Sequence, residues 1–346
     1  MEVEKLRNDL CTFFGTDYEK TIAKNKIDEA KNMVFLQDDK WYREKIFTEV
    51  NDEVLNNFDI ELEFVENNHQ HDLWQYFRIH TSSIKTSKNI GRNIRILVKH
   101  KQSGKYLGIL ALASDIKNCE SRDKYIGWTN NIKVKKLQYI MNISCCVGLQ
   151  PIAFNYNIGK LLVGLCFSKE VLNYHKNKYG HDLACITTFS INGKSIQYDR
   201  IPQYLKHVGE TKGNSFATTL PDELYKRCLK YLHHIKDTRT LSWVNKLYKI
   251  NKVMSYLDIE VNAASIRKRG VYIGFTSEES KSFMSSMTTR FELDYSKIQD
   301  AKSIVAWWKR RWAHQRYEHL KATNRLRYSL ELVNAYKLYN CEKVKK

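Results

Sequence analysis

Four apolar runs of strand length lie in the middle of the chain. They are IRILV, KYLGILALAS, IMNISCCVGLQPI and LACITTFSI, at residues 94–98, 105–114, 140–152 and 183–191. Ser103-Gly104 lies between the first two runs and Asn192-Gly193 follows the last, and both dipeptides are typical of turns. The pattern predicts four strands, of which the first two form a β-hairpin.

A helix pattern separates the third run from the fourth. Pro151 ends the third run, the loop AFNYNIGK follows at 153–160, and leucines at helical spacing come next. Ser168 occupies the place of an N-cap for a second helical stretch, and Gly180 that of the residue that ends it. Because strands and helices alternate, we expect layers of helix and sheet, with an α/β or α+β core.

Both flanks of this core look helical. The candidate helices are residues 18–35, residues 41–58, a helix that starts at Pro221 with Asp222 and Glu223, one capped by Thr276 and Glu279, and one long basic helix or two in tandem at 301–339. The predicted organisation is an acidic, mostly helical segment at 1–73, an α+β core at 74–215 and a basic helical region at 216–346.

The charge along the chain is strongly asymmetric. The formal net charge is +19, yet residues 1–75 hold 9 Lys and Arg against 18 Asp and Glu, whereas residues 302–346 hold 12 against 3. Phosphates attract lysine and arginine, and binding releases counterions, so this asymmetry favours a polyanionic partner such as nucleic acid. A basic surface that serves only solubility is the alternative.

Export and membrane insertion are not expected. The start MEVEKLRNDL lacks a signal pattern, and no window approaches 18 uninterrupted apolar residues. Eight cysteines are scattered without Cys-x-x-Cys spacing, which favours reduced, mostly buried thiols and a cytoplasmic protein. His69-x-His71 with Asp72 and the pair at 233–234 lack the spacing of a zinc site, so we expect no metal.

The loop at 153–160 is a candidate anion site. A loop that enters a helix points several backbone N–H groups at one place, and the helix dipole favours an anion there. Asn155, Asn157 and Gly159 form no known glycine-rich fingerprint, so a loop that simply turns the chain is the alternative.

Eight short motifs together resemble the DruA-like family. They are YFRIHTSS (76–83), GR (91–92), YLGILALASD (106–115), RDKYIGW (122–128), NIGKLL (157–162), YG (179–180), TTFS (187–190) and HVGETKG (207–213). DruA belongs to the Druantia anti-phage defence system, and relatives look to be encoded in transposons and viruses. The resemblance implies a defence, viral or mobile-element context, with protein partners from such an assembly, and does not imply a particular reaction.

The same segment is similar, more distantly, to the GNAT acyltransferases. That resemblance implies a central mixed sheet and acyl-coenzyme A held by a strand, a loop and a helix. Here the backbone amides of Asn155, Asn157 and Gly159 and the charge of Lys160 would hold the pyrophosphate, and Tyr198 would act as general acid. The Arg/Gln-x-x-Gly-x-Gly/Ala loop of those enzymes is absent. A turning loop and a core tyrosine are therefore the alternative.

Acidic residues within the family motifs are further catalytic candidates. Asp123 and Glu210, with Asp115 and Asp199, could act as a base or as metal ligands. We select Asp123 and Glu210 beside Tyr198, although scattered acids do not by themselves establish a site.

Two stretches combine cations with aromatic rings, as nucleic-acid sites do. In RDKYIGW, Arg122 could grip a phosphate and Trp128 could stack on a base, or the two could form a salt bridge and a packed indole. In residues 306–327, Trp308 and Trp312 would seat a helix whose basic side chains face a phosphate backbone: Lys309, Arg310, Arg311, Arg316, Lys321, Arg325 and Arg327. A solvated basic helix is the alternative.

Two functions are consistent with these patterns. One is a nucleic-acid-directed, GNAT-like group transferase, which the loop and Tyr198 favour. The other is a non-catalytic component that binds DNA or RNA in a defence or transposon assembly, which the missing loop signature and the basic helix favour.

Overall fold

A computed structural model of the chain describes residues 2–15, 39–82, 91–190, 193–214, 220–243, 246–259 and 268–329. The predicted helix at 18–35, Asn192 of the predicted turn, and the part of the predicted helix after residue 329 lie outside these ranges.

Seven strands of the described residues form one mixed sheet in the order β1-β2-β3-β4-β5-β7-β6. The strands are β1 (Ile60–Phe64), β2 (Asn93–His100), β3 (Tyr106–Ser114), β4 (Ile140–Gly148), β5 (Cys185–Ser190), β6 (Lys206–Asn214) and β7 (Lys268–Phe275). Only β4 and β5 are parallel neighbours; the other pairs are antiparallel. The fold is therefore α+β, and the predicted hairpin is β2–β3.

The centre of the sheet is covered on both faces. Along β3, Leu110 and Leu112 join one apolar cluster, whereas Ile109 and Ala111 join another, because successive side chains of a strand point to opposite faces. The first cluster includes α8 (Ile152–Tyr156) and α9 (Ile158–Leu165); the second includes α5 (Asn68–Thr81). This double burial explains why β3 reads as one continuous apolar run.

The parallel strands β4 and β5 are joined through α8, α9 and α10 (Lys169–Tyr179). The side chain of Ser168 accepts a hydrogen bond from the backbone of Val171, and Gly180 ends α10 with a φ of 76°, so both predicted caps are confirmed. β4 pairs with β5 only from Ile140 to Ile143; its remaining residues pair with β3 alone. The two strands therefore separate after their first half.

The three predicted segments interleave in space. Residues 41–58 are not one helix: α3 (Asp39–Glu44) and α4 (Asp52–Asn56) flank an extended stretch, and β1 follows as an edge strand. β7, which comes from the predicted helical region, lies between β5 and β6. The sheet thus takes strands from all three segments. The short helices α6 (Glu120–Ile126) and α7 (Asn130–Lys136) precede β4.

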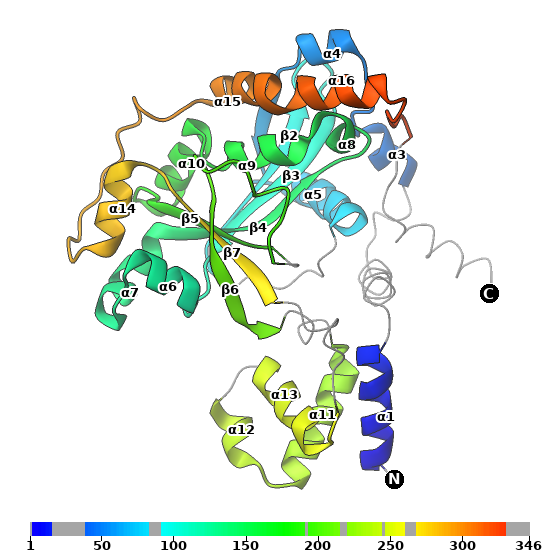
Figure 1. Cartoon of the computed structure of the whole chain (residues 1–346), viewed down its shortest axis with the longest axis vertical. Coiled ribbons are helices and arrows are strands. Elements are labelled where there is room, and N and C mark those ends of the chain that lie inside the picture. The colour runs from blue at the N-terminus through cyan, green and yellow to red at the C-terminus, as the bar shows by residue number, and fades with distance from the viewer. Residues whose placement is uncertain are drawn as a thin grey trace.

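Later in the chain than β7, one helix of mixed geometry crosses a face of the sheet. It comprises α15 (Ala301–Trp308), a π-helical turn at Lys309–Ala313 and α16 (His314–Ala322), which run on as a single rod in Figure 1. We call it the C-terminal helix. Before it, α14 (Glu278–Ser285) is capped by Ser277 with Ser280, not by the predicted pair Thr276 and Glu279.

A separate bundle is formed by α1 (Glu2–Gly15), α11 (Asp222–His234), α12 (Thr238–Trp243) and α13 (Lys246–Tyr256). Its buried residues, including Leu10, Leu232 and Ile250, form a cluster of their own, and Figure 1 shows the bundle apart from the sheet. α11 begins at Asp222, one residue after the predicted start at Pro221, which lies at the N-cap position. Among the described helices, none is both long enough and apolar enough to cross a membrane.

Candidate functional site

The C-terminal helix is seated by Trp308. Its side chain is fully buried, and its indole N–H donates to the carbonyl oxygen of Asn157 at 3.2 Å. Ile304, four residues earlier, and Tyr317, nine residues later, are buried in the same cluster. This apolar stripe faces the sheet and leaves the basic residues of the helix at its rim and outer side.

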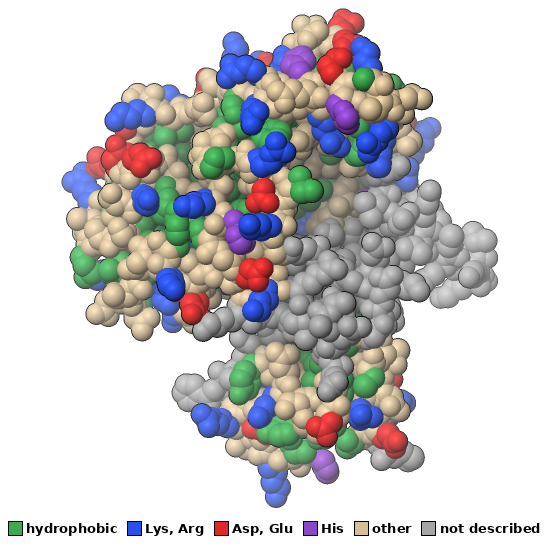
Figure 2. All heavy atoms as spheres, in the orientation of Figure 1, with side chains coloured by type: hydrophobic (Ala, Val, Ile, Leu, Met, Phe, Trp, Pro, Cys, Tyr) green, Lys and Arg blue, Asp and Glu red, His purple; other side chains and the backbone are tan. Residues whose placement is uncertain are grey.

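The basic residues of the C-terminal helix have different surroundings. Lys309 donates to the carbonyl oxygen of Asn56 and Arg316 to that of Phe154, so both are tied to neighbouring loops. Arg310 and Arg311 are exposed, and neither forms an ion pair within the described part of the chain. These two guanidinium groups are therefore open to an external anion. Figure 2 shows Lys and Arg side chains along and below this helix.

A second group of arginines surrounds Phe154. The guanidinium carbon of Arg316 lies 4.6 Å from the ring centroid and that of Arg327 lies 3.9 Å from it. Burial, and then the charges of Arg325 and Arg327, lower the pKa of Arg316 below its usual value. Like charges this close repel one another, which favours an anion beside them.

Three cations crowd the ring of Trp312. The ammonium of Lys160 lies 4.6 Å from its centroid, and the guanidinium carbons of Arg311 and Arg200 lie 5.3 and 5.6 Å from it. The indole nitrogen is buried and has no hydrogen-bond partner among the described residues. Arg200 has a backbone φ of 65°, which is uncommon for a residue with a side chain.

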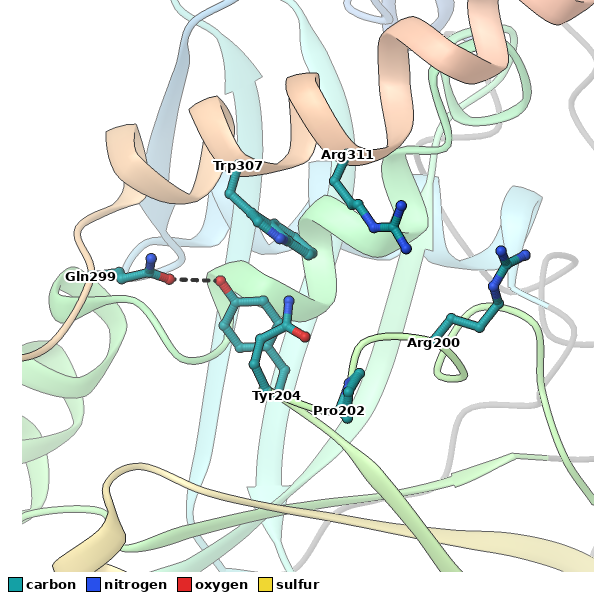
Figure 3. Close-up of a pocket in the computed structure, with 7 residues that line it drawn as sticks. Arg200, Pro202, Tyr204, Gln299, Trp307 and Arg311 are labelled. Atoms are coloured by element: carbon teal, nitrogen blue, oxygen red, sulfur yellow. Dashed lines mark hydrogen bonds between the residues drawn. The ribbon is translucent and has the colours of Figure 1, made fainter.

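A pocket of about 440 Å³ opens beside this ring, between the C-terminal helix and residues 200–204. Figure 3 shows Trp307 and Arg311 reaching down from the helix toward Tyr204, Pro202 and Arg200. The pocket is lined by Arg200, Pro202, Gln203, Tyr204, Gln299, Trp307 and Arg311. Sequence analysis did not single out Arg200, Gln299 or Trp307, because no local pattern shows that residues a hundred positions apart meet.

Side chains of the loop at 153–160 bind other segments of the chain. The amide of Asn155 donates to the carbonyl oxygen of Arg327 at 2.5 Å and accepts from its N–H at 3.0 Å. Lys160 is buried, donates to the carbonyl oxygens of Ile196 (2.6 Å) and Asp199, and has a pKa lowered to about 8 by burial.

The remaining residues of the loop are also engaged. Asn157 begins α9 in the left-handed conformation without a side-chain cap. A Cβ on Gly159 would lie 3.3 Å from the side chain of Gln197. These contacts match the alternative of a loop that turns the chain. Asn155 is fully buried, and the ammonium of Lys160 donates to the carbonyl oxygens of Ile196, Gln197 and Asp199, so neither side chain is open to a pyrophosphate.

Tyr198, Asp123 and Glu210 are not brought together. Tyr198 is half-buried against the ring of Tyr272, and burial raises its pKa above its usual range. Asp123 pairs with Arg122 and Lys133 at 2.6 and 3.1 Å. Glu210 is an exposed residue of β6. The three side chains share no hydrogen bond within the described residues, so they do not form a catalytic cluster there.

Arg122 and Trp128 are structural residues. Arg122 is fully buried and donates to Asp115 at 2.8 Å and to the carbonyl oxygens of Ile116 and Lys117. It also lies 5.0 Å from the ring of Trp128, whose N–H donates to a backbone carbonyl at 2.7 Å. The expected phosphate grip is therefore replaced by the salt-bridge alternative, because no N–H of Arg122 faces solvent.

Comparison with known proteins places the chain in a family. The profile described as Druantia protein DruA matches residues 15–247, which is more than half of the chain. The chain belongs to the DruA family. "Druantia protein DruA" of Escherichia coli (strain UMEA 4076-1) is 26% identical over 258 residues, which cover 67% of this chain and 62% of that relative. The match thus spans less than two thirds of the relative's length. No solved structure matches the chain.

The DruA match covers only part of the candidate site. Arg200 and Tyr204 lie within residues 15–247, whereas Trp307, Arg311 and Trp312 lie beyond them. β7 and the C-terminal helix of this DruA-family chain also lie outside the match. The pocket is therefore built where the matched core meets the following region.

Proposed function

We propose that this DruA-family chain is a nucleic-acid-binding component of an anti-phage defence system. The family supports the defence context. The observation that carries nucleic-acid binding is the pair of exposed arginines, Arg310 and Arg311, which have no ion pair within the described ranges; Arg311 also lies beside Trp312. Guanidinium groups bind phosphate in a bidentate manner, and an adjacent aromatic ring suits a base.

The structure favours the non-catalytic alternative over group transfer. Coenzyme A would need open donors on the loop at 153–160, and there the side chains of Asn155 and Lys160 are buried and bound to backbone carbonyl oxygens. The opening where β4 and β5 separate is filled by the chain itself, since Gln197 donates to the carbonyl oxygen of Cys146 at 3.0 Å. Tyr198 follows in the same filling segment.

One observation still supports a GNAT-like ancestry. Among the described strands, β4 and β5 are the one parallel pair; they are joined through helices, and a strand–loop–helix unit follows β4. A GNAT-like transferase acting on nucleic acid is therefore the second proposal. It predicts that coenzyme A or acetyl-coenzyme A raises the melting temperature of the protein, and the absence of any shift would contradict it.

The salt dependence of binding tests the main proposal. We expect Arg310→Gln/Arg311→Gln to weaken binding of a labelled oligonucleotide and to reduce the slope of log K against log salt by about 1.4 to 1.8, which is two lost phosphate contacts. Fluorescence anisotropy between low and moderate salt measures the slope.

The matched control removes two positive charges elsewhere. Arg290 and Lys297 are exposed cations that pair locally with Glu292 and Asp294. Arg290→Gln/Lys297→Gln should leave the slope close to that of the wild type. An unchanged slope in the Arg310/Arg311 variant, or an equal change in the control, would show that the C-terminal helix does not contact the phosphates.

A further inference from the structure

We infer that the pocket between the C-terminal helix and residues 200–204 holds one nucleotide with an unpaired base. The phosphate would lie between Arg200 and Arg311, and the base would lie against Trp307. This inference rests on the proposed function and names the kind of nucleic acid that the site prefers.

The pocket has the size of a ligand site. Its volume of about 440 Å³ lies within the range of ~300–1,000 Å³ that small-molecule sites occupy. Its floor is the buried Tyr204, and its walls are Trp307 and the exposed arginines. A planar ring and a phosphate can therefore occupy it together.

The positive charge at one end of the pocket favours binding of an anion. Arg200 and Arg311 both approach the ring of Trp312, which Lys160 also contacts. Neither arginine has an ion pair among the described residues; Asp199, which precedes Arg200 in the sequence, accepts a hydrogen bond from the hydroxyl of Tyr272. Two guanidinium groups on one phosphate would relieve the repulsion among these cations.

The other end of the pocket suits a base. Tyr204 packs edge-on against Trp307, with centroids 5.1 Å apart and an angle of 77°, which fixes the indole. The hydroxyl of Tyr204 donates to Oε1 of Gln299 at 2.9 Å, as Figure 3 shows, and so fixes which way the amide faces. The Nε2 group of Gln299 then remains a donor for an acceptor on a base edge.

An unpaired base is required because a base inside a duplex is stacked on both faces. Only a single strand, a strand end or a free nucleotide can present a base to Trp307 without the cost of unstacking. Arg310 continues the positive surface on the helix that carries Arg311, so a strand could run on from the pocket. A free nucleotide has the same chemistry, and the two sources are separated by experiment.

The test compares three ligands: a labelled single-stranded oligonucleotide, the fully paired duplex of the same length and adenosine monophosphate. We expect wild-type protein to prefer the single strand. Trp307→Leu should weaken single-strand binding about 5- to 150-fold, the usual effect of losing one stacked base, and should leave duplex binding nearly unchanged. Trp307→Phe should restore part of the loss.

Arg200→Gln provides a second variant that removes an exposed side chain and leaves the apolar core intact. It should weaken binding of the single strand and flatten its salt slope. Tyr248→Leu, which replaces a half-exposed ring on the separate bundle, is the matched control and should change neither value. Saturable binding of adenosine monophosphate without a preference for the single strand would assign the pocket to a free nucleotide. It would contradict the inference that the pocket holds a nucleotide of a strand.

The outcomes also separate this inference from the proposed function. If Trp307→Leu and Arg200→Gln bind single strands like the wild type while Arg310→Gln/Arg311→Gln binds weakly, the pocket is not a nucleotide site but the helix still binds nucleic acid. If all of these variants bind like the wild type, both proposals are wrong.

Discussion

Arg122 illustrates a charge whose donors are fully used inside the protein. It contacts Asp115, which has no exposed side-chain surface and also accepts from Thr187 at 2.9 Å. Burial lowers the pKa of Arg122, but the neighbouring Asp115 and Asp123 more than offset this effect and hold it above its usual value. The arginine therefore stays charged, and its removal would leave a buried carboxylate without a partner.

Arg122→Met should lower the free energy of unfolding by about 3–5 kcal/mol, since breaking a buried ion pair strands the other charge. Urea denaturation followed by circular dichroism measures the change. Lys124→Met, on the exposed side of the same helix, is the control and should change stability by less than about 0.5 kcal/mol. Similar effects in the two variants would contradict the role assigned to Arg122.

His175 is a buried neutral histidine. Its Nδ1 lies 3.1 Å from the carbonyl oxygen of His181, so Nδ1 carries the proton and Nε2 faces Arg92 at 3.5 Å. Burial, and then the positive Arg92 and the neighbouring His181, lower the pKa of His175 to about 3, although Asp182 acts in the opposite direction. The folded protein therefore resists protonation of this ring.

This shift makes stability depend on pH with a definite sign. The unfolded chain takes up a proton near pH 6.5, whereas the folded chain does so only near pH 3, so stability is lost as the pH falls through this window. Between pH 6.5 and 5 the loss from His175 should be about 2 kcal/mol. His175→Gln should remove that part of the pH dependence, and His234→Gln, at an exposed position, should not.

At the scale of elements, Asn155 joins α8 to the chain that follows α16. Both ends of its amide bind the backbone of Arg327, and the side chain is fully buried. This contact holds Arg327 near Phe154, where Arg316 also lies. A residue predicted to hold a cofactor thus positions part of the basic surface.

Asn155→Asp tests this connection with little change of volume. The variant keeps the acceptor for the N–H of Arg327 but turns the donor into an oxygen that faces a carbonyl, which should cost about 1–3 kcal/mol. We expect faster hydrogen exchange at residues 325–328 and little change in exchange elsewhere. Asn130→Asp, on exposed α7, is the control. Unchanged exchange at 325–328 would show that Asn155 does not anchor this segment.

Local signals predicted several elements well. Ser168 and Gly180 cap the two ends of α10, and each acts on the turn next to it. β2 and β3 are long apolar runs, so neighbouring residues were sufficient evidence for these elements. β6 was missed because KHVGETKGN has almost no apolar residues. β1 was missed, in a segment expected to be mostly helical, because a short edge strand with mixed polarity has no clear alternation.

At the scale of the whole molecule, the described residues form two cores: that of the sheet, with apolar clusters on both faces, and that of the separate bundle. The N-terminal α1 packs with α11 and α13, although more than 200 residues separate them, as the contact of Arg7 with the carbonyl oxygen of Leu257 shows. Residues 46–64 belong to the sheet instead. The acidic segment at 1–73 is therefore shared between the two cores, and its deletion would damage both.

Two cores predict two unfolding transitions. Leu10 is fully buried in the bundle, so Leu10→Ala should destabilise the bundle by about 2–5 kcal/mol and leave the transition of the sheet in place. Differential scanning calorimetry can resolve the two events. Val3→Ala, at a position of α1 that is 39% exposed, is the control. A single transition that shifts as a whole would show that bundle and sheet unfold together.

Patterns in the sequence were sufficient to predict the α+β class, the central hairpin, the caps of α10, the family and the location of the basic helix. These features depend on local apolar spacing, on turn chemistry or on the order of motifs. Tertiary structure alone decided which charges are available. It buried Arg122 and Lys160 against partners, and it placed Arg200 beside Arg311 and Trp307. Burial and pairing depend on contacts between distant segments, so no local pattern could distinguish an internal cation from one that faces an external phosphate.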